Sequence, residues 1–164
     1  MKFGVLTVSD RSSRGERPDL SGPALTSLLT SNGNQVIKVG IVPDEINLIQ
    51  NCLIEWVNSG ELDIILTTGG TGFAPRDVTP EATRGVVERL TPGLDEAMRA
   101  KSLLLTPNAM LSRAVSGIRN KTLIINFPGS PKAALENFAI IYPILEHAIK
   151  LLSEDPGAEK GHSS

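Results

Sequence analysis

The stretch LDIILTTGGTG, residues 62–72, joins a short apolar run to a loop that is rich in glycine. Residues 62–68 are apolar and β-branched, which is typical of a buried strand. The loop that follows places glycines at three positions, Gly69, Gly70 and Gly72. Glycines allow the backbone to approach a ligand closely and to turn its N–H groups toward an anion. The loop lacks the Gly-Lys-Ser/Thr ending of the Walker motif, and residues 73–78 separate it from the next helix, unlike a dinucleotide-binding loop. Its position after a buried strand favours phosphate binding over a purely structural turn.

Predicted strands and helices alternate on both sides of this stretch. Apolar runs predict strands over residues 2–9, 35–42, 62–68, 114–118 and 122–127. Apolar residues at helical spacing predict helices over residues 21–32, 45–59, 80–90, 94–105 and 131–152. Residues 10–20 are predicted to form a loop, and Pro143 predicts either a kink in the last helix or a break into two helices.

This alternation indicates a three-layer α/β domain, in which a mostly parallel sheet carries helices on both faces. We expect the 164 residues to form one such domain over residues 1–153, followed by a flexible tail at residues 154–164. Domains of this kind bind ligands in the crevice at the carboxyl ends of their strands. The residues that follow each strand are therefore the candidates for a functional site.

The composition of the chain excludes several classes of protein. Its 16 basic and 18 acidic residues give a net charge of −2 without a basic block, which argues against nucleic-acid binding. The single cysteine, Cys52, excludes an internal disulfide, and Cys52, His147 and His162 form no zinc motif. No secretory or membrane-spanning segment is recognisable in the sequence. We therefore expect a cytoplasmic protein that does not contact a membrane.

One edge of the predicted sheet gathers polar residues, because the carboxyl ends of parallel strands meet there. These residues are Ser9 and Asp10 after the first strand, Asp44 after the second, and Asn126, Gly129 and Ser130 at the end of the last. Ser130 and Pro131 are expected to cap and open the final helix, whose free N–H groups would then face this edge. The same two residues also suit a helix start without a ligand.

Asp44 and Asp77 are the carboxylates expected to face this crevice, where a Mg²⁺ ion would join them to a phosphate. Each also has a structural interpretation. Asp44 could cap the helix that begins at Glu45, and Asp77 could pair with Arg76 or Arg113.

Three further segments carry polar or reactive groups, and the pattern leaves the role of only the first of them open. Ser112 and Arg113 would offer a hydroxyl and a cation to a charged substrate, or they would serve as turn residues. Thr79 and Pro80 are typical of a helix start, with the Thr79 hydroxyl as the N-cap. Cys52 lies on an apolar helix face and is expected to be inert.

Together these motifs resemble the molybdopterin adenylyltransferases, the MogA-like family that includes the gephyrin G domain. The longest match is TTGGTGFAPRDVTPEAT at residues 67–83. The shorter matches are LTVSD at 6–10, VPDE at 42–45, MLSR at 110–113, and TLIIN with the following PGS at 122–130. The resemblance covers most of residues 2–152 and implies a MogA/MoaB-like fold.

The resemblance also implies a reaction. The terminal phosphate of molybdopterin would attack the α-phosphate of ATP in the presence of Mg²⁺, giving adenylylated molybdopterin and pyrophosphate. Catalysis and metal binding are assigned to Asp44 and Asp77 by this resemblance. Substrate binding is placed at Gly69, Gly70, Thr71, Gly72, Ser102, Ser112 and Asn126, and extended to Ser9, Asp10, Gly129 and Ser130.

The resemblance further implies a homotrimer and a separate molybdenum-inserting protein as a partner. Two other classes of protein stay open at this point. One is a noncatalytic pterin-binding or scaffold protein with the same fold, and the other is a phosphohydrolase of nucleotides or dinucleotides. The presence of Asp44, Asp77 and Ser112 favours the adenylyltransferase.

Overall fold

A six-stranded sheet forms the centre of the molecule in the computed structural model, which describes residues 1–154. Its strands are β1 (Lys2–Val8), β2 (Gln35–Val42), β3 (Ile64–Thr68), β4 (Arg89–Leu90), β5 (Ser116–Arg119) and β6 (Thr122–Phe127). They lie in the order β2-β1-β3-β6-β5-β4. The first four pair in parallel, whereas β6 with β5 and β5 with β4 pair antiparallel. The predicted mostly parallel sheet is confirmed, and β2, β1, β3 and β6 all end at the same edge.

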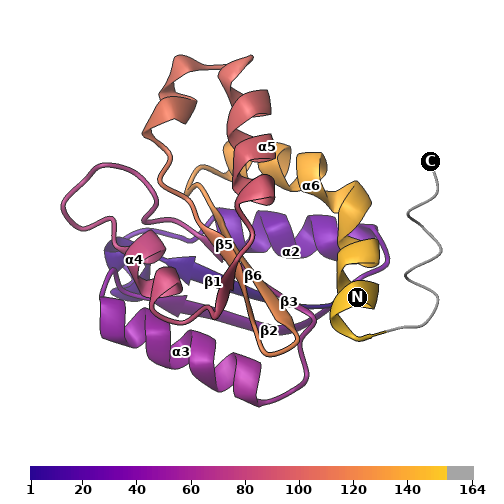
Figure 1. The fold of residues 1–164 in the computed structure, drawn as a ribbon. Helices are drawn as coiled ribbons and strands as arrows, with labels where there is room; N and C mark the ends of the chain where they lie inside the picture. Colours follow the sequence, from indigo (N-terminus) through magenta and orange to yellow (C-terminus); the bar gives the residue numbers. More distant parts are fainter. Residues whose placement is uncertain (155–164) are drawn as a thin grey trace.

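Helices cover both faces of the sheet (Figure 1). They are α1 (Asp10–Ser13), α2 (Ser21–Ser31), α3 (Ile46–Asn58), α4 (Thr79–Arg84), α5 (Pro92–Leu103), the 3-10 helix η1 (Pro107–Leu111) and α6 (Pro131–Leu152). On one face, α2 and α6 bury a cluster that includes Phe3 and Phe138. On the other face, α3 and α4 bury a cluster that includes Leu53 and Ile65. The predicted three-layer α/β fold is confirmed.

Burial explains why the strand sequences read as continuous apolar runs. Every residue of β3 and of β6 is buried, because helices cover both faces of these strands. The edge strand β2 differs, since exposed and half-buried residues alternate along it. None of the helices within residues 1–154 combines the length and the apolar character that crossing a membrane requires.

Two of the sequence-based expectations about local structure are wrong. Residues 10–20 are not only a loop, because the Ser9 hydroxyl accepts a hydrogen bond from the Ser12 backbone N–H at 3.2 Å and caps the single turn of α1. The helix predicted over residues 80–90 already ends at Arg84. Leu90 instead belongs to β4, where pairing with β5 outweighs the helical spacing of the apolar residues.

The last two helices agree more closely with their sequence patterns. α5 begins at Pro92, two positions before the predicted start, because proline suits the first turn of a helix. α6 is a single helix with Pro143 inside it, and Figure 1 shows its ribbon changing direction along the helix. A kink rather than a break therefore accommodates the proline. The tail expected at residues 154–164 lies outside the described residues, apart from Glu154.

The aromatic contacts of α6 with the sheet predict a large loss of stability on truncation of Phe138. This side chain is buried, and its ring centroid lies 6.3 Å from that of Phe3 and 6.4 Å from that of Phe127 in edge-to-face geometry. We expect Phe138→Ala to lower the free energy of unfolding by about 3–5 kcal/mol, measured by urea denaturation followed by circular dichroism. Ile144→Ala, on an exposed side of the same helix, should cost about 1 kcal/mol or less. Equal losses in the two variants would contradict this packing.

Candidate functional site

A cavity of about 760 Å³ opens at the carboxyl ends of β1, β3 and β6, and we call it the polar cavity. The predicted site residues that line it are Ser9, Asp10, Asp44, Gly69, Gly70, Asp77, Gly129 and Ser130. These residues come from four segments that are far apart in the sequence. The topology of the sheet brings them together, as expected for a domain in which parallel strands end at one edge.

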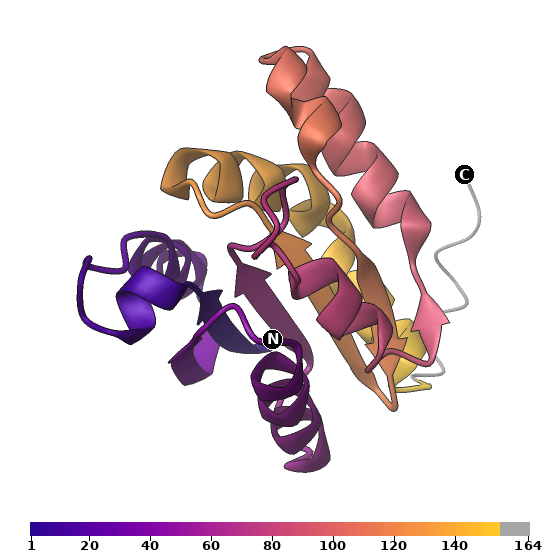
Figure 2. The ribbon, with the colours of Figure 1, turned by 90° about the vertical axis from the view of Figure 1, so that its left-hand side faces the viewer.

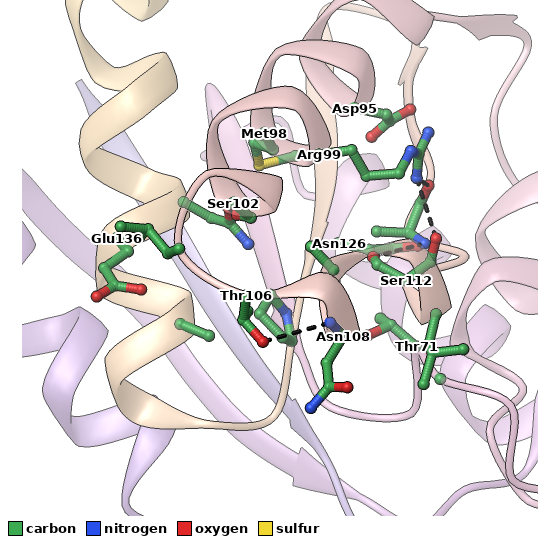
Figure 3. A pocket seen from close by; sticks show the side chains of 18 residues that line it. Thr71, Asp95, Met98, Arg99, Ser102, Thr106, Asn108, Ser112, Asn126 and Glu136 are labelled. Carbon is green, nitrogen blue, oxygen red and sulfur yellow. Dashed lines mark hydrogen bonds between the residues drawn. The ribbon is translucent and has the colours of Figure 1, made fainter.

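A second cavity of about 260 Å³ lies between α5, η1 and the start of α6, and we call it the apolar cavity because Met98, Leu105 and Leu111 line it. The predicted site residues that line it are Thr71, Gly72, Ser102, Ser112 and Asn126. Figure 3 shows Ser102 across this cavity from Ser112 and Thr71. Hydroxyl groups therefore interrupt an otherwise apolar wall.

The glycine loop, residues 69–72, separates the two cavities. Gly69 and Gly70 line the polar cavity, whereas Thr71 and Gly72 line the apolar cavity. Figure 2 shows the segment after β1 on one side of this loop, and α5 with η1 on the other. The sequence suggested one continuous rim, but the structure divides the predicted residues between two adjoining sites.

Gly69 holds the loop over the end of β1. Its φ is +104°, and a Cβ atom at this position would clash with the carbonyl oxygen of Val8, so any side chain here would be strained. The Gly69 backbone N–H donates to the carbonyl of Phe127 at 3.1 Å. The Thr79 hydroxyl donates to the carbonyl of Gly69 at 2.8 Å and makes no cap bond to α4, so the predicted capping role of Thr79 is wrong.

Asp10 and Asp44 bind one another's backbone. The Asp10 N–H donates to Asp44 Oδ2 at 2.7 Å, and the Asp44 N–H donates to Asp10 Oδ1 at 3.1 Å. Arg76 Nε and Nη2 donate to the two carboxylate oxygens of Asp10 at 3.0 and 2.9 Å, and Arg76 also pairs with Glu45 at 2.9 Å. The Asp44 carboxylate thus holds the loop after β1 and does not cap α3, whose N-cap position is Glu45.

The two linked carboxylates differ in their electrostatic environment. Hydrogen bonds from the Arg76 guanidinium lower the pKa of Asp10 below its usual value. Burial raises the pKa of Asp44, and the negative charges of Asp10 and Asp77 raise it further. The Asp44 carboxylate is therefore under-compensated inside the protein, and a bound cation would stabilise it.

Asp77 carries a second carboxylate without a cationic partner. Asp77 Oδ2 accepts a hydrogen bond from the Ala74 N–H at 3.1 Å, and no ion pair involves this carboxylate within residues 1–154. Arg113 instead donates to the backbone carbonyls of Gly72 at 2.7 Å and Asp77 at 2.5 Å, and it pairs with Glu81. The suggested pairing of Asp77 with Arg76 or Arg113 is not found. Arg113 acts as a clamp on the loop rather than as a free cation for a substrate.

The first turn of α6 faces the polar cavity. Pro131 opens the helix as predicted, and Ser130 occupies the N-cap position, but its hydroxyl makes no cap bond. Both residues line the polar cavity. The N–H groups of this turn lack partners inside the helix and give the helix end a partial positive charge.

Two of the predicted residues of the apolar cavity already bind other protein groups. The amide Nδ2 of Asn126 donates to the hydroxyls of Thr67 at 2.8 Å and Thr83 at 2.9 Å. The Asn126 side chain is fully buried and fixes the cavity wall rather than offering an N–H to a ligand. Ser102 donates its hydroxyl to Asn137 Oδ1 at 2.8 Å, which leaves the oxygen able to accept a hydrogen bond.

The sequence analysis missed Asp95 and Arg99, which also line the apolar cavity. Asp95 is buried and accepts hydrogen bonds from the Ser116 N–H at 2.9 Å and hydroxyl at 2.8 Å, and burial raises its pKa. Arg99 Nη1 donates to the carbonyl of Ser112 at 3.2 Å (Figure 3). An acidic residue in the first turn and an arginine later in a helix are ordinary helix features, so nothing in the sequence distinguishes them.

Comparison with known proteins identifies the family. A family model described as a probable molybdopterin binding domain matches residues 4–147. The chain belongs to this family. It is 44% identical over 152 residues to the molybdopterin adenylyltransferase of Helicobacter pylori, and the match covers 92% of this chain and 86% of that protein.

Other members of the molybdopterin-binding family are similarly close. Gephyrin of Dictyostelium discoideum is 45% identical over 163 residues, which cover 93% of this chain, and the chain spans 23% of the length of that gephyrin. The crystal structure of the molybdopterin biosynthesis enzyme MoaB from Thermus thermophilus superposes with a TM-score of 0.88 at 48% identity, over 94% of this chain and 98% of that one. The MogA/MoaB-like fold expected from the sequence is confirmed.

The donor groups of the polar cavity suit a magnesium ion that arrives with a phosphate ligand. Within the described part of the chain, no three or more His, Cys, Asp or Glu side chains gather into a metal cluster. Mg²⁺ is usually held by one or two carboxylates together with water and substrate phosphates. The carboxylates of Asp44 and Asp77 fit this pattern, because neither forms an ion pair within residues 1–154.

The close approach of Gly69 to Val8 predicts that Gly69→Ala destabilises the protein. The methyl group would meet the Val8 carbonyl at a backbone φ that side chains rarely adopt. We expect a loss of about 1–3 kcal/mol in the free energy of unfolding, measured by thermal and urea denaturation. Gly93→Ala is the matched control, since its Cβ atom would meet nothing within 4 Å. If both variants unfolded like the wild type, the loop would not depend on this contact.

The contrast between Asp44 and Asp10 predicts opposite effects of neutralising them. Because the pKa of Asp44 is raised in the folded state, Asp44→Asn should increase the melting temperature at neutral pH. Because the pKa of Asp10 is lowered, Asp10→Asn should decrease it. Both differences should vanish in acid. The Asp44 difference fades as the pH falls through its raised folded-state pKa and is gone below the ordinary value of 3.8, whereas the Asp10 difference is lost only as the pH falls below 3.8 and through its lowered folded-state pKa. Melting curves from strongly acidic to neutral pH test both, and shifts of the same sign would contradict the assignment.

Proposed function

We propose that this chain is a molybdopterin adenylyltransferase, which transfers the adenylyl group of ATP to the terminal phosphate of molybdopterin with Mg²⁺ present and releases pyrophosphate. The observation that carries the proposal is the pair of adjoining cavities of unlike character on either side of the glycine loop. A transferase for two substrates needs two such sites beside one another. The Helicobacter pylori relative bears the name of this activity.

The character of each cavity suggests which substrate it takes. The apolar cavity suits a flat pterin ring, since Met98 and Leu111 offer apolar contacts while Ser102 and Ser112 offer hydrogen bonds to its polar edge. The polar cavity suits the phosphate groups of ATP, because it combines glycine backbone with the first turn of α6. Molybdopterin would then present its terminal phosphate to ATP across the glycine loop.

The chemistry needs no nucleophile from the protein. The second pKa of a phosphate monoester is about 6, so the terminal phosphate of molybdopterin is largely dianionic at neutral pH and attacks without a protein base. An oxygen of this phosphate forms a bond to the α-phosphorus of ATP. The bond from that phosphorus to the oxygen bridging to the β-phosphate breaks, and its electron pair leaves with pyrophosphate. Rate enhancement therefore comes from positioning and from charge stabilisation.

Asp44 and Asp77 would hold the Mg²⁺ ion. When bound, this ion neutralises phosphate charge and so reduces the repulsion between two anionic substrates. The protein itself supplies fixed positions. The Asp10 N–H orients the Asp44 carboxylate, and the Arg113 clamp on the carbonyls of Gly72 and Asp77 holds the loop in place.

The wider cellular role follows the same proposal. We infer that the domain comprises residues 1–153, works in the cytoplasm as a homotrimer, and passes adenylylated molybdopterin to a separate molybdenum-inserting protein. Exposed apolar side chains at the tip formed by α5 and η1, among them Leu104, Leu105 and Met110, offer a surface for contact between subunits.

The catalytic role of the carboxylates predicts that Asp77→Asn abolishes most of the turnover. Asparagine retains an oxygen that accepts from the Ala74 N–H but removes the charge that would hold Mg²⁺. We expect kcat for adenylylated molybdopterin to fall at least about a hundredfold, measured by mass spectrometry of product and pyrophosphate. Asp63→Asn is a control of the same chemistry beside the opposite edge of the sheet, where Asp63 accepts from the Lys2 N–H, and should keep full turnover.

Two outcomes of this assay would change the conclusion. Unchanged turnover in Asp77→Asn would show that the catalytic assignment is wrong. A wild-type protein that binds molybdopterin but forms no adenylylated product would be a noncatalytic pterin-binding protein. Release of phosphate or pyrophosphate without any pterin would instead indicate a phosphohydrolase.

A further inference from the structure

The segment between β1 and α2 brings three arginines to the wall of the polar cavity. Arg11, Arg14 and Arg17 line it, and Arg76 lines it from the loop after β3. None of them belongs to the residues assigned above to catalysis or substrate binding. A cavity at the strand ends thus combines carboxylates with an arginine cluster.

The four arginines differ in how far the protein already uses them. Arg76 is committed to Asp10 and Glu45. Arg14 donates to both carboxylate oxygens of Glu16, at 2.7 and 3.1 Å. The guanidinium groups of Arg11 and Arg17 make no hydrogen bond and no ion pair with any residue in the range 1–154.

Four of the charged groups that line the polar cavity form no ion pair within residues 1–154 and are separated by sign, with the cations on one segment and the carboxylates on two others. The cations of Arg11 and Arg17 come from the segment after β1, and the carboxylates of Asp44 and Asp77 come from the loops after β2 and β3. A ligand that matches both the arginines and the carboxylates must carry several negative charges. It must also carry a divalent cation, which the carboxylates would bind. A magnesium complex of a nucleoside triphosphate has this distribution.

We propose that Arg11 and Arg17 bind the β- and γ-phosphates of the nucleotide and thereby hold the leaving pyrophosphate. This proposal rests on the proposed function, because it takes Asp44 and Asp77 to act at the α-phosphate, where the bond breaks. Guanidinium groups bind phosphate oxygens through paired, charge-assisted hydrogen bonds. The negative charge that the bridging oxygen gains as its bond to the α-phosphorus breaks is stabilised by these arginines.

Calorimetric titration of the full chain with Mg-ATP and with magnesium pyrophosphate tests this site without requiring turnover. Arg11→Ala and Arg17→Ala should each weaken binding of both ligands about tenfold, and the double variant should weaken it more. Both side chains are exposed and form no hydrogen bond or ion pair within residues 1–154, so the variants should melt like the wild type. Binding of molybdopterin, which would occupy the apolar cavity, should stay unchanged.

Two control variants each remove one positive charge from a residue that is not proposed to bind phosphate. Lys121→Ala lies in the exposed turn between β5 and β6, at the opposite edge of the sheet, and should bind both ligands like the wild type. Arg14→Ala removes an arginine of the same segment that is already paired with Glu16, and should have a smaller effect than either Arg11→Ala or Arg17→Ala. Arg17→Lys should recover part of the affinity, because it restores the charge without the planar fork.

The possible results separate this proposal from the proposed function. Mg-ATP and pyrophosphate affinities that stay unchanged in the double variant, or fall equally in Lys121→Ala, would overturn the arginine site. If adenylylated molybdopterin still formed in the wild type, the proposed function would stand without it. If the wild type formed no product while Mg-ATP binding depended on both arginines, the triphosphate site would stand and the proposed function would fall.

Discussion

The contact between the Gly69 backbone and the carbonyl of Val8 is the constraint on which both cavities depend. It allows the chain leaving β3 to fold over the end of β1 rather than to continue outward. From there, the carbonyl of Gly69 accepts the Thr79 hydroxyl, and the carbonyl of Thr71 accepts the Arg113 N–H at 2.9 Å. The loop is thereby fixed from both sides, and its four residues become the shared wall of two sites. A single backbone position that favours glycine thus determines where the two cavities adjoin.

The pattern of ion pairs leaves the Asp77 carboxylate without an ion pair within residues 1–154. Arg76 lies beside Asp77 in the sequence, yet it pairs with Asp10 and Glu45 on the neighbouring loops. Arg113 passes close to Asp77 and donates to its backbone carbonyl only. Arg76 and Arg113 are thus used to fix loops and do not neutralise the Asp77 carboxylate. These two arginines therefore position loops and leave the carboxylate charge of Asp77 in the cavity.

The sequence predicted the framework well because the framework depends on local patterns. The apolar runs locate β1, β2, β3 and β6 almost to the residue, and the rule that ligands bind at the strand ends selects the edge of the sheet where the polar cavity lies. Partition of the site into two cavities was not predictable, because it depends on where α5 and η1 pack against the loop. The exchange of hydrogen bonds between Asp10 and Asp44 is likewise a tertiary contact between residues 34 positions apart. β4 escaped detection since two residues are too few to carry a periodicity.

The Asp44 carboxylate lies in a position that is unfavourable for the stability of the folded domain. Its carboxylate is half-buried near two other carboxylates, an arrangement that raises its pKa and that a neutral side chain would avoid. The hydrogen bond from the Asp10 N–H needs only an oxygen, so an asparagine would serve the fold equally well. The charge itself therefore has no structural use inside the protein, whereas a cation shared with a phosphate ligand would balance it. Locally unfavourable charge beside a glycine loop is what a binding site for a metal–phosphate complex requires, and it is the feature of this rim that folding alone does not explain.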